Sequence, residues 1–155
     1  MCYHTGMKET HTVSQTDLSA LAERVVYLLS QDNKDKASVV LLEGDLGAGK
    51  TTFTQALAEH LGVMEHVHSP TFILKKEYKT PHTDFKKVVH IDAYRFTHPQ
   101  EAKVLRLEED LKDSGTIVVI EWPLKMTYVK SDIRLDFSVI DEDTREVVLT
   151  YEKDI

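Results

Sequence analysis

The sequence has almost no cysteine and no long apolar run. Cys2 is the single cysteine of 155 residues, so an intrachain disulfide is excluded. No apolar stretch approaches the ~20 residues that a membrane-spanning helix needs. Residues 1–6 also lack the charged flank and apolar core of a secretion signal. The sequence therefore predicts a cytoplasmic protein with no membrane partner.

Positive charge is also in short supply. Lysine and arginine number 19 against 26 acidic residues, which gives a net charge of −7. Such a field repels polyanions, so another protein is expected to hold most of any nucleic acid involved. A lysine cluster over residues 75–87 is interpreted as a solvated hairpin surface. His66 and His68 have no cysteine or acidic ligands at suitable spacing, which argues against a zinc site.

Hydrophobic residues make up 41% of the chain and charged residues 29%, as in globular proteins. At this length we expect one domain over residues 1–155, with residues 1–11 as a loose tail. The most informative stretch is residues 44–51, which match the phosphate-binding pattern G-x-x-x-x-G-K-[ST]. Residues 39–42 before it predict a buried strand. Apolar spacing over residues 53–61 predicts a helix that Gly62 ends.

Periodicity predicts the remaining elements. A helix is expected from Thr16, capped by Ser14 or Thr16, and another from Thr97 to about Lys112 with Val104, Leu107 and Leu111 buried. Strands are expected at 72–78, 87–91, 116–120, 133–139 and 147–151. The first two and the last two of these strands are each expected to form a hairpin. Together they predict an α/β fold, a three-layer sandwich like that of P-loop NTPases, with a small mixed sheet.

The pattern at 44–51 points to a bound chain of phosphates and to Mg²⁺. Backbone N–H groups of the loop would hold the α and β phosphates, Lys50 would reach the β and γ oxygens, and the Thr51 hydroxyl would bind Mg²⁺. The expected nucleotide-binding residues are Gly44, Asp45, Leu46, Gly47, Ala48, Gly49, Lys50, Thr51, Thr52 and Trp122.

Such a site also needs a carboxylate at the end of a neighbouring strand. Asp92 and Glu121 each follow an apolar strand, and the residues alone leave both open. Thr71 either supplies a second hydroxyl that senses the γ phosphate or is an ordinary turn threonine. Arg95 either neutralises phosphate charge or forms a surface ion pair. Trp122 either flanks the site or packs over the strand end.

Four segments resemble, in order and approximate spacing, the bacterial TsaE family, also called YjeE. They are GDLGAGKTTF at 44–53, SPTF at 69–72, HIDAYR at 90–95 and IEWP at 120–123. The resemblance implies a small P-loop ATPase required for threonylcarbamoyladenosine modification of tRNA next to the anticodon. It also implies TsaB and TsaD as partners, with tRNA met only through them. In that family TsaD transfers the threonylcarbamoyl group, and the ATPase drives or resets the cycle.

By this resemblance Thr51 and Glu121 serve Mg²⁺, Thr71 belongs to a switch loop, and Asp92 is essential to hydrolysis. Lys50, Asp92, Thr71 and Glu121 are thus the expected catalytic residues, and Trp122 lies near nucleotide or partner. The sequence departs from the family pattern after Pro123. The resemblance therefore carries no role over to residues 124–155, Arg145 included.

Two other classes of function fit a phosphate-binding loop. A small metabolite kinase would need an acceptor pocket and an arginine-bearing lid, but the five arginines are widely scattered. A nucleotide-gated binding module would hold ATP and barely hydrolyse it. This binding module is consistent with the sequence, which shows no obvious arginine finger.

Overall fold

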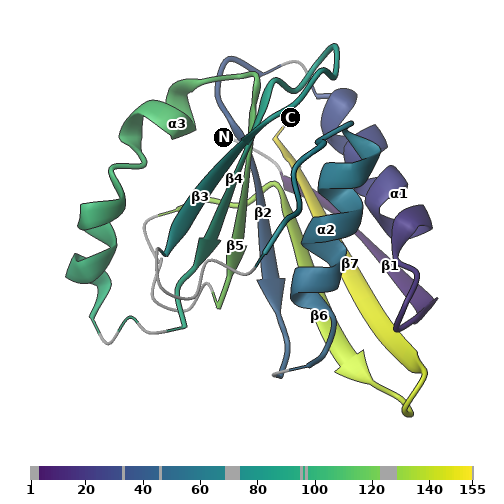
Figure 1. Ribbon diagram of the computed structural model, residues 1–155. Coiled ribbons are helices and arrows are strands. Elements are labelled where there is room, and N and C mark those ends of the chain that lie inside the picture. The colour runs from purple at the N-terminus through teal and green to yellow at the C-terminus, as the bar shows by residue number, and fades with distance from the viewer. Residues whose placement is uncertain are drawn as a thin grey trace.

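A mixed β-sheet forms the centre of the computed structural model (Figure 1). The structure describes residues 4–32, 34–45, 47–68, 74–94, 96, 98–122 and 129–154. Within these ranges the strands are β1 His4–Ser14, β2 Ser38–Glu43, β3 Lys75–Lys79, β4 Lys87–Asp92, β5 Thr116–Glu121, β6 Ile133–Val139 and β7 Thr144–Asp154. The helices are α1 Ser19–Ser30, α2 Lys50–His60 and α3 Glu108–Lys112, with a 3-10 helix, η1, at Pro99–Leu105. None of the helices in the described ranges is long and apolar enough to cross a membrane.

The strand order is β1-β7-β6-β2-β5-β4-β3. Strand β2 pairs in parallel with both β5 and β6, and β4 pairs in parallel with β5. The two predicted hairpins, β3–β4 and β6–β7, pair antiparallel and are confirmed. Because β2, β4 and β5 run in the same direction, their carboxyl ends meet at one edge of the sheet.

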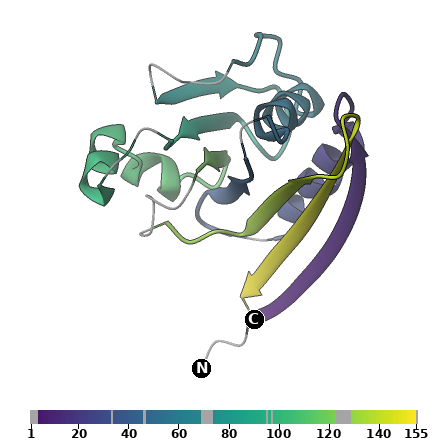
Figure 2. The ribbon, with the colours of Figure 1, turned by 90° about the horizontal axis from the view of Figure 1, so that it is seen from below.

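Apolar side chains cover both faces of the central strands. Val40, Leu42, Val88, Ile117 and Val119 pack with α1 and α2 in one core, and alternate residues of the same strands pack with Leu105 and Leu107 in a second core. Strands buried on both faces read as continuous apolar runs, which is why 39–42 and 116–120 were recognisable in the sequence. The predicted three-layer α/β sandwich is confirmed, and Figure 2 views its layers from the end where the phosphate-binding loop lies.

The predicted loose tail is wrong for residues 4–11. These residues belong to β1, which pairs antiparallel with β7 over its whole length. Its side chains are mostly polar. Among those described, Met7 and Val13 are the apolar ones that pack against the core, and Glu9 pairs with Arg24 of α1, so backbone pairing contributes most of what holds the strand. The following helix begins at Ser19 and not at Thr16, and no side chain caps it; Asp17 accepts hydrogen bonds from Ser19 just before its first turn.

The single helix predicted for residues 97–112 is also wrong. The segment contains η1, a break at Arg106 with a φ of 51°, and then α3. Leu105 and Leu107 are both buried, whereas Val104, which was predicted to be buried, is 71% exposed. Two leucines at i and i+2 do not share one face of a continuous α-helix, so the break is what lets both pack against the sheet.

An acidic residue fastens this segment to the sheet. The buried carboxylate of Asp110 lies 2.7 Å from the Lys75 ammonium of β3 and 2.7 Å from the Lys87 ammonium of β4. Burial alone would raise the pKa of Asp110, but hydrogen bonds from the two lysines hold it below its ordinary value. Two members of the lysine cluster are therefore structural, whereas Lys76, Lys79 and Lys86 are exposed as expected.

Asp110→Asn is expected to lower the free energy of unfolding by about 1–3 kcal/mol, because it removes the buried counter-charge of Lys87 and leaves Lys75 with the exposed Glu77 as its counter-charge. The native pKa lies below the unfolded one, so the contribution is present above about pH 4 and is lost as the pH falls through the native value. Urea unfolding from pH 7 to pH 3 should therefore give a shallower acid loss for the variant than for the wild type. Glu109→Gln, at an exposed position of the same helix, is the control. Parallel curves for wild type and Asp110→Asn would contradict this account.

Candidate functional site

The loop between β2 and α2 has the backbone of a phosphate-binding turn. Gly44 has a φ of 150°, and a Cβ there would lie 2.9 Å from the Phe137 carbonyl oxygen of β6. Gly49, in the left-handed region at a φ of 112°, is the N-cap of α2. Side chains larger than hydrogen are excluded at the first position and strained at the second. The free N–H groups at the start of α2 therefore lie at the mouth of a tight, glycine-shaped loop.

Lys50, the first residue of α2, is only 5% exposed. Its ammonium donates to the Gly44 carbonyl and lies 3.3 Å from the centre of the Trp122 ring. Burial lowers the pKa of Lys50, while the nearby carboxylates of Glu121 and Asp92 act in the opposite direction. A neutral carbonyl and an aromatic face are weak partners for a buried cation, so a phosphate oxygen would compete for it effectively.

Glu121 lies at the carboxyl end of β5 with 3% of its surface exposed. The Thr51 hydroxyl lies 3.2 and 3.3 Å from its two carboxylate oxygens and donates to them. On the other side, Nε2 of His90 lies 2.7 Å from Oε2 of Glu121. Glu121 is thus held between the first turn of α2 and strand β4.

Asp92 is the residue opposite Glu121 in the β4–β5 register, and it is 7% exposed. One of its carboxylate oxygens accepts the Tyr94 backbone N–H at 3.0 Å. Trp122 has a φ of 58° and a ring 5.0 Å from that of Tyr94. The left-handed backbone at Trp122 therefore turns the chain at the end of β5, and the indole lies over the Lys50 ammonium.

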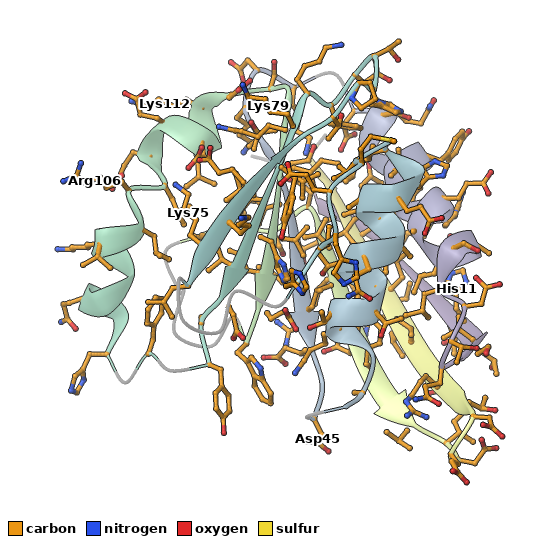
Figure 3. The ribbon with its side chains drawn as sticks, viewed as in Figure 1. His11, Asp45, Lys75, Lys79, Arg106 and Lys112 are labelled. Atoms are coloured by element: carbon orange, nitrogen blue, oxygen red, sulfur yellow. The ribbon has the colours of Figure 1, made fainter. Side chains whose placement is uncertain are left out.

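The structure brings together most of the residues that the sequence singled out. Gly44, Lys50, Thr51, Asp92, Glu121 and Trp122 gather at one end of the sheet, with Ala48 buried beneath the loop and Thr52 in the first turn of α2. Asp45 lies at the outer tip of the loop, where Figure 3 labels it. Leu46, Thr71 and Arg95 lie outside the described residues.

The donor set suits Mg²⁺, which prefers oxygen ligands and a small number of protein groups. Thr51 and Glu121 supply a hydroxyl and a carboxylate within hydrogen-bonding distance of each other. Among the described residues, no group of three or more His, Cys, Asp or Glu side chains is arranged to hold a metal ion by itself. A magnesium ion here would take its other ligands from phosphate and water.

Sequence reasoning missed two residues at this site. His90 shares the sheet face of Asp92, since the two are separated by two positions on one strand; a polar residue inside an apolar strand was the available signal. Arg145 of β7 is 6% exposed, donates to the Asp141 and Thr144 carbonyls, and reaches the Gly47 carbonyl at 3.4 Å. That contact joins residues 98 positions apart, so no local sequence pattern could predict it.

Comparisons with known proteins agree on one family. The model of the family described as threonylcarbamoyl adenosine biosynthesis protein TsaE matches residues 12–147. The chain is 42% identical to the tRNA threonylcarbamoyladenosine biosynthesis protein TsaE of a Nostoc species over 117 residues, 73% of this chain and 70% of the relative. It is 36% identical to the protein of the same name from Aquifex aeolicus over 143 residues, 91% and 94% of the two chains.

A solved structure agrees as well. The crystal structure of Bacillus subtilis YdiB superposes with a TM-score of 0.64 at 27% identity, covering 97% of this chain and 87% of that one. The family match spans the phosphate-binding loop and both strand-end carboxylates. The chain therefore belongs to the TsaE family of threonylcarbamoyladenosine biosynthesis proteins.

Proposed function

We propose that this chain binds ATP with Mg²⁺ and hydrolyses it slowly, as the ATPase that acts with TsaB and TsaD in threonylcarbamoyladenosine modification of tRNA. One observation carries the proposal: the buried Lys50 ammonium and the Thr51–Glu121 pair meet at the mouth of the glycine-shaped loop. A cation, an anion-binding helix end and a hydroxyl–carboxylate pair that can hold a metal, gathered beside one loop, suit a magnesium-bound triphosphate. The role in threonylcarbamoyladenosine modification is inferred from membership of the TsaE family.

The chain's own groups divide the task of binding the nucleotide. Backbone N–H groups of the loop and of the first turn of α2 hold the α and β phosphates. Lys50 exchanges the Gly44 carbonyl for β and γ oxygens, while the Trp122 ring covers the ammonium and keeps water from it. Because this lysine is already buried and held in place, little side-chain entropy is lost when phosphate binds.

The oxygen donors of Thr51 and Glu121 hold the metal. Bound Mg²⁺ neutralises charge that develops on the β and γ phosphates. Asp92, next to Glu121 in the register, orients the attacking water. Thr71 acts as a switch residue and Leu46 as a residue of the phosphate-binding loop; both lie outside the described residues. Because the net charge of this chain is −7, tRNA is held by the partner proteins.

The kinase alternative has less support. Of the described arginines, Arg24 is paired with Glu9, Arg134 is paired with Glu43 and Asp136, and Arg145 is bonded to turn carbonyls. Arg106 lies beside α3, far from Asp45 at the loop tip (Figure 3). None of these four arginines is both unpaired and close to the loop, as a lid over a transferred phosphate requires. The nucleotide-gated module is separated from the ATPase only by measured turnover.

Lys50→Ala is expected to weaken ATP binding roughly ten- to hundredfold, since a hydrogen bond to a charged group contributes about 1.5–3 kcal/mol. Calorimetric titration with ATP and Mg²⁺ measures the change, and phosphate release measures the loss of turnover. Lys79→Ala removes an exposed lysine of β3 as the control. Unchanged ATP binding and turnover in Lys50→Ala would overturn the central assignment.

Glu121→Gln is expected to act mainly through the metal, because the amide keeps the shape of the side chain but loses the charge that binds Mg²⁺. Nucleotide binding should weaken strongly when Mg²⁺ is present and little when EDTA replaces it. The matched control is Glu59→Gln, at an exposed position of α2. Equal losses with and without Mg²⁺ would argue against a metal role.

Reconstituted tRNA modification separates the first class of function from the others. With TsaB, TsaD, tRNA and a source of the threonylcarbamoyl group, multiple-turnover formation of modified tRNA should require this chain and ATP, and ATP turnover should rise with the partner pair. Lys50→Ala should fail to replace the wild type. Modification that proceeds equally well without the chain would point to the kinase or the binding module.

A further inference from the structure

A completely buried histidine, His90, contacts the pair formed by Thr51 and Glu121. His90 lies on β4 with 0% of its surface exposed, on the same strand face as Val88 and Asp92. Its Nε2 atom is 2.7 Å from Oε2 of Glu121. Its Nδ1 atom has no hydrogen-bond partner among the described residues. Within the described residues, the Glu121 carboxylate is therefore the one hydrogen-bond partner of this ring.

The two ring nitrogens define the tautomer. A carboxylate only accepts hydrogen bonds, so the proton must lie on Nε2 for the 2.7 Å contact to be favourable. Nδ1 is then a bare acceptor, which is tolerated in a buried setting better than an unpaired N–H donor. His90 accordingly donates its Nε2–H to Glu121.

Glu121 has other partners that it could reach without this bond. Its side chain has three rotatable bonds, and its carboxylate interacts electrostatically with the Lys50 ammonium. In the structure the carboxylate instead faces the Thr51 hydroxyl at 3.2 and 3.3 Å, and Lys50 contacts the loop carbonyl and the indole. The bond from His90 ties the carboxylate to β4 and keeps it on the Thr51 side.

We propose that His90 is a positioning residue that orients Glu121 for the metal, through an Nε2–H bond to Oε2, and so leaves Lys50 free for phosphate. The inference rests on the proposed function, because it concerns the same magnesium site. A valine or leucine would fill the same place in the apolar layer beside Val119 without a buried polar atom. Residues that orient a metal ligand in this way typically change metal affinity or activity about 10- to 100-fold when lost.

The tautomer can be read without nucleotide or activity. In ¹⁵N-histidine-labelled protein, ring nitrogen shifts should identify His90 with a protonated Nε2 and an unprotonated Nδ1, and Glu121→Gln should perturb the Nε2 signal. A proton on Nδ1, or an Nε2 signal that ignores Glu121→Gln, would overturn the proposal. This result does not depend on whether the chain hydrolyses ATP.

The functional test compares two replacements of the ring. His90→Gln can present an amide N–H near the Nε2 position, whereas His90→Leu cannot donate. The Mg²⁺ concentration for half-maximal nucleotide binding should rise roughly tenfold or more in His90→Leu and return close to wild type in His90→Gln. Nucleotide affinity in EDTA should fall less than this in His90→Leu, because a released Glu121 then competes with phosphate for Lys50, and should stay close to wild type in His90→Gln. If His90→Leu does not fold, His90→Asn, whose amide is too short to reach Glu121, takes its place.

A double-variant cycle separates positioning from packing. In the Glu121→Gln background, His90→Leu should add no further loss of Mg²⁺ dependence, because the residue through which it acts has already been neutralised. Equal Mg²⁺ dependence in wild type, His90→Leu and His90→Gln, with only melting temperatures changed, would make His90 a core residue and defeat the inference. If instead the wild type binds no nucleotide, the proposed function fails, and the ring-nitrogen measurement still decides the His90–Glu121 bond.

Discussion

The parallel pairing of β2, β5 and β4 is the constraint on which the rest of the structure depends. It brings the carboxyl ends of three strands to one edge and sets Asp92 opposite Glu121. Helical segments cover both faces of these strands, and a one-residue slip in register would exchange the side chains that pack in the two cores. The register that packs the cores is thus the register that assembles the site.

The phosphate-binding loop is braced by the C-terminal hairpin as well as by its own glycines. Gly44 meets the backbone of Phe137 with no room for a Cβ, and Arg145 links the β6–β7 turn to the Gly47 carbonyl. A loop shaped before phosphate arrives loses less conformational entropy on binding. The C-terminal hairpin, to which the resemblance assigned no role, therefore supports the candidate site.

Local patterns in the sequence carried most of the fold and most of the candidate site. The central strands and the loop were predictable because apolar runs and glycine spacing are local signals. Strand β1 was missed because backbone pairing with β7, and not an apolar alternation, holds it. The break between Leu105 and Leu107 arises from packing on the sheet, and the contacts of His90 and Arg145 join distant segments. Such nonlocal causes leave little trace in a single sequence.

The central claim is that Lys50, Thr51 and Glu121, at this edge of the sheet, form a site for a nucleotide and Mg²⁺. A crystal structure of the chain with Mg²⁺ and a non-hydrolysable ATP analogue tests it most directly. The account predicts that the Lys50 ammonium leaves the Gly44 carbonyl for the β and γ oxygens, and that Thr51 turns from Glu121 to the metal. Phosphates bound away from this loop, or a metal that contacts neither Thr51 nor the water shell of Glu121, would contradict it.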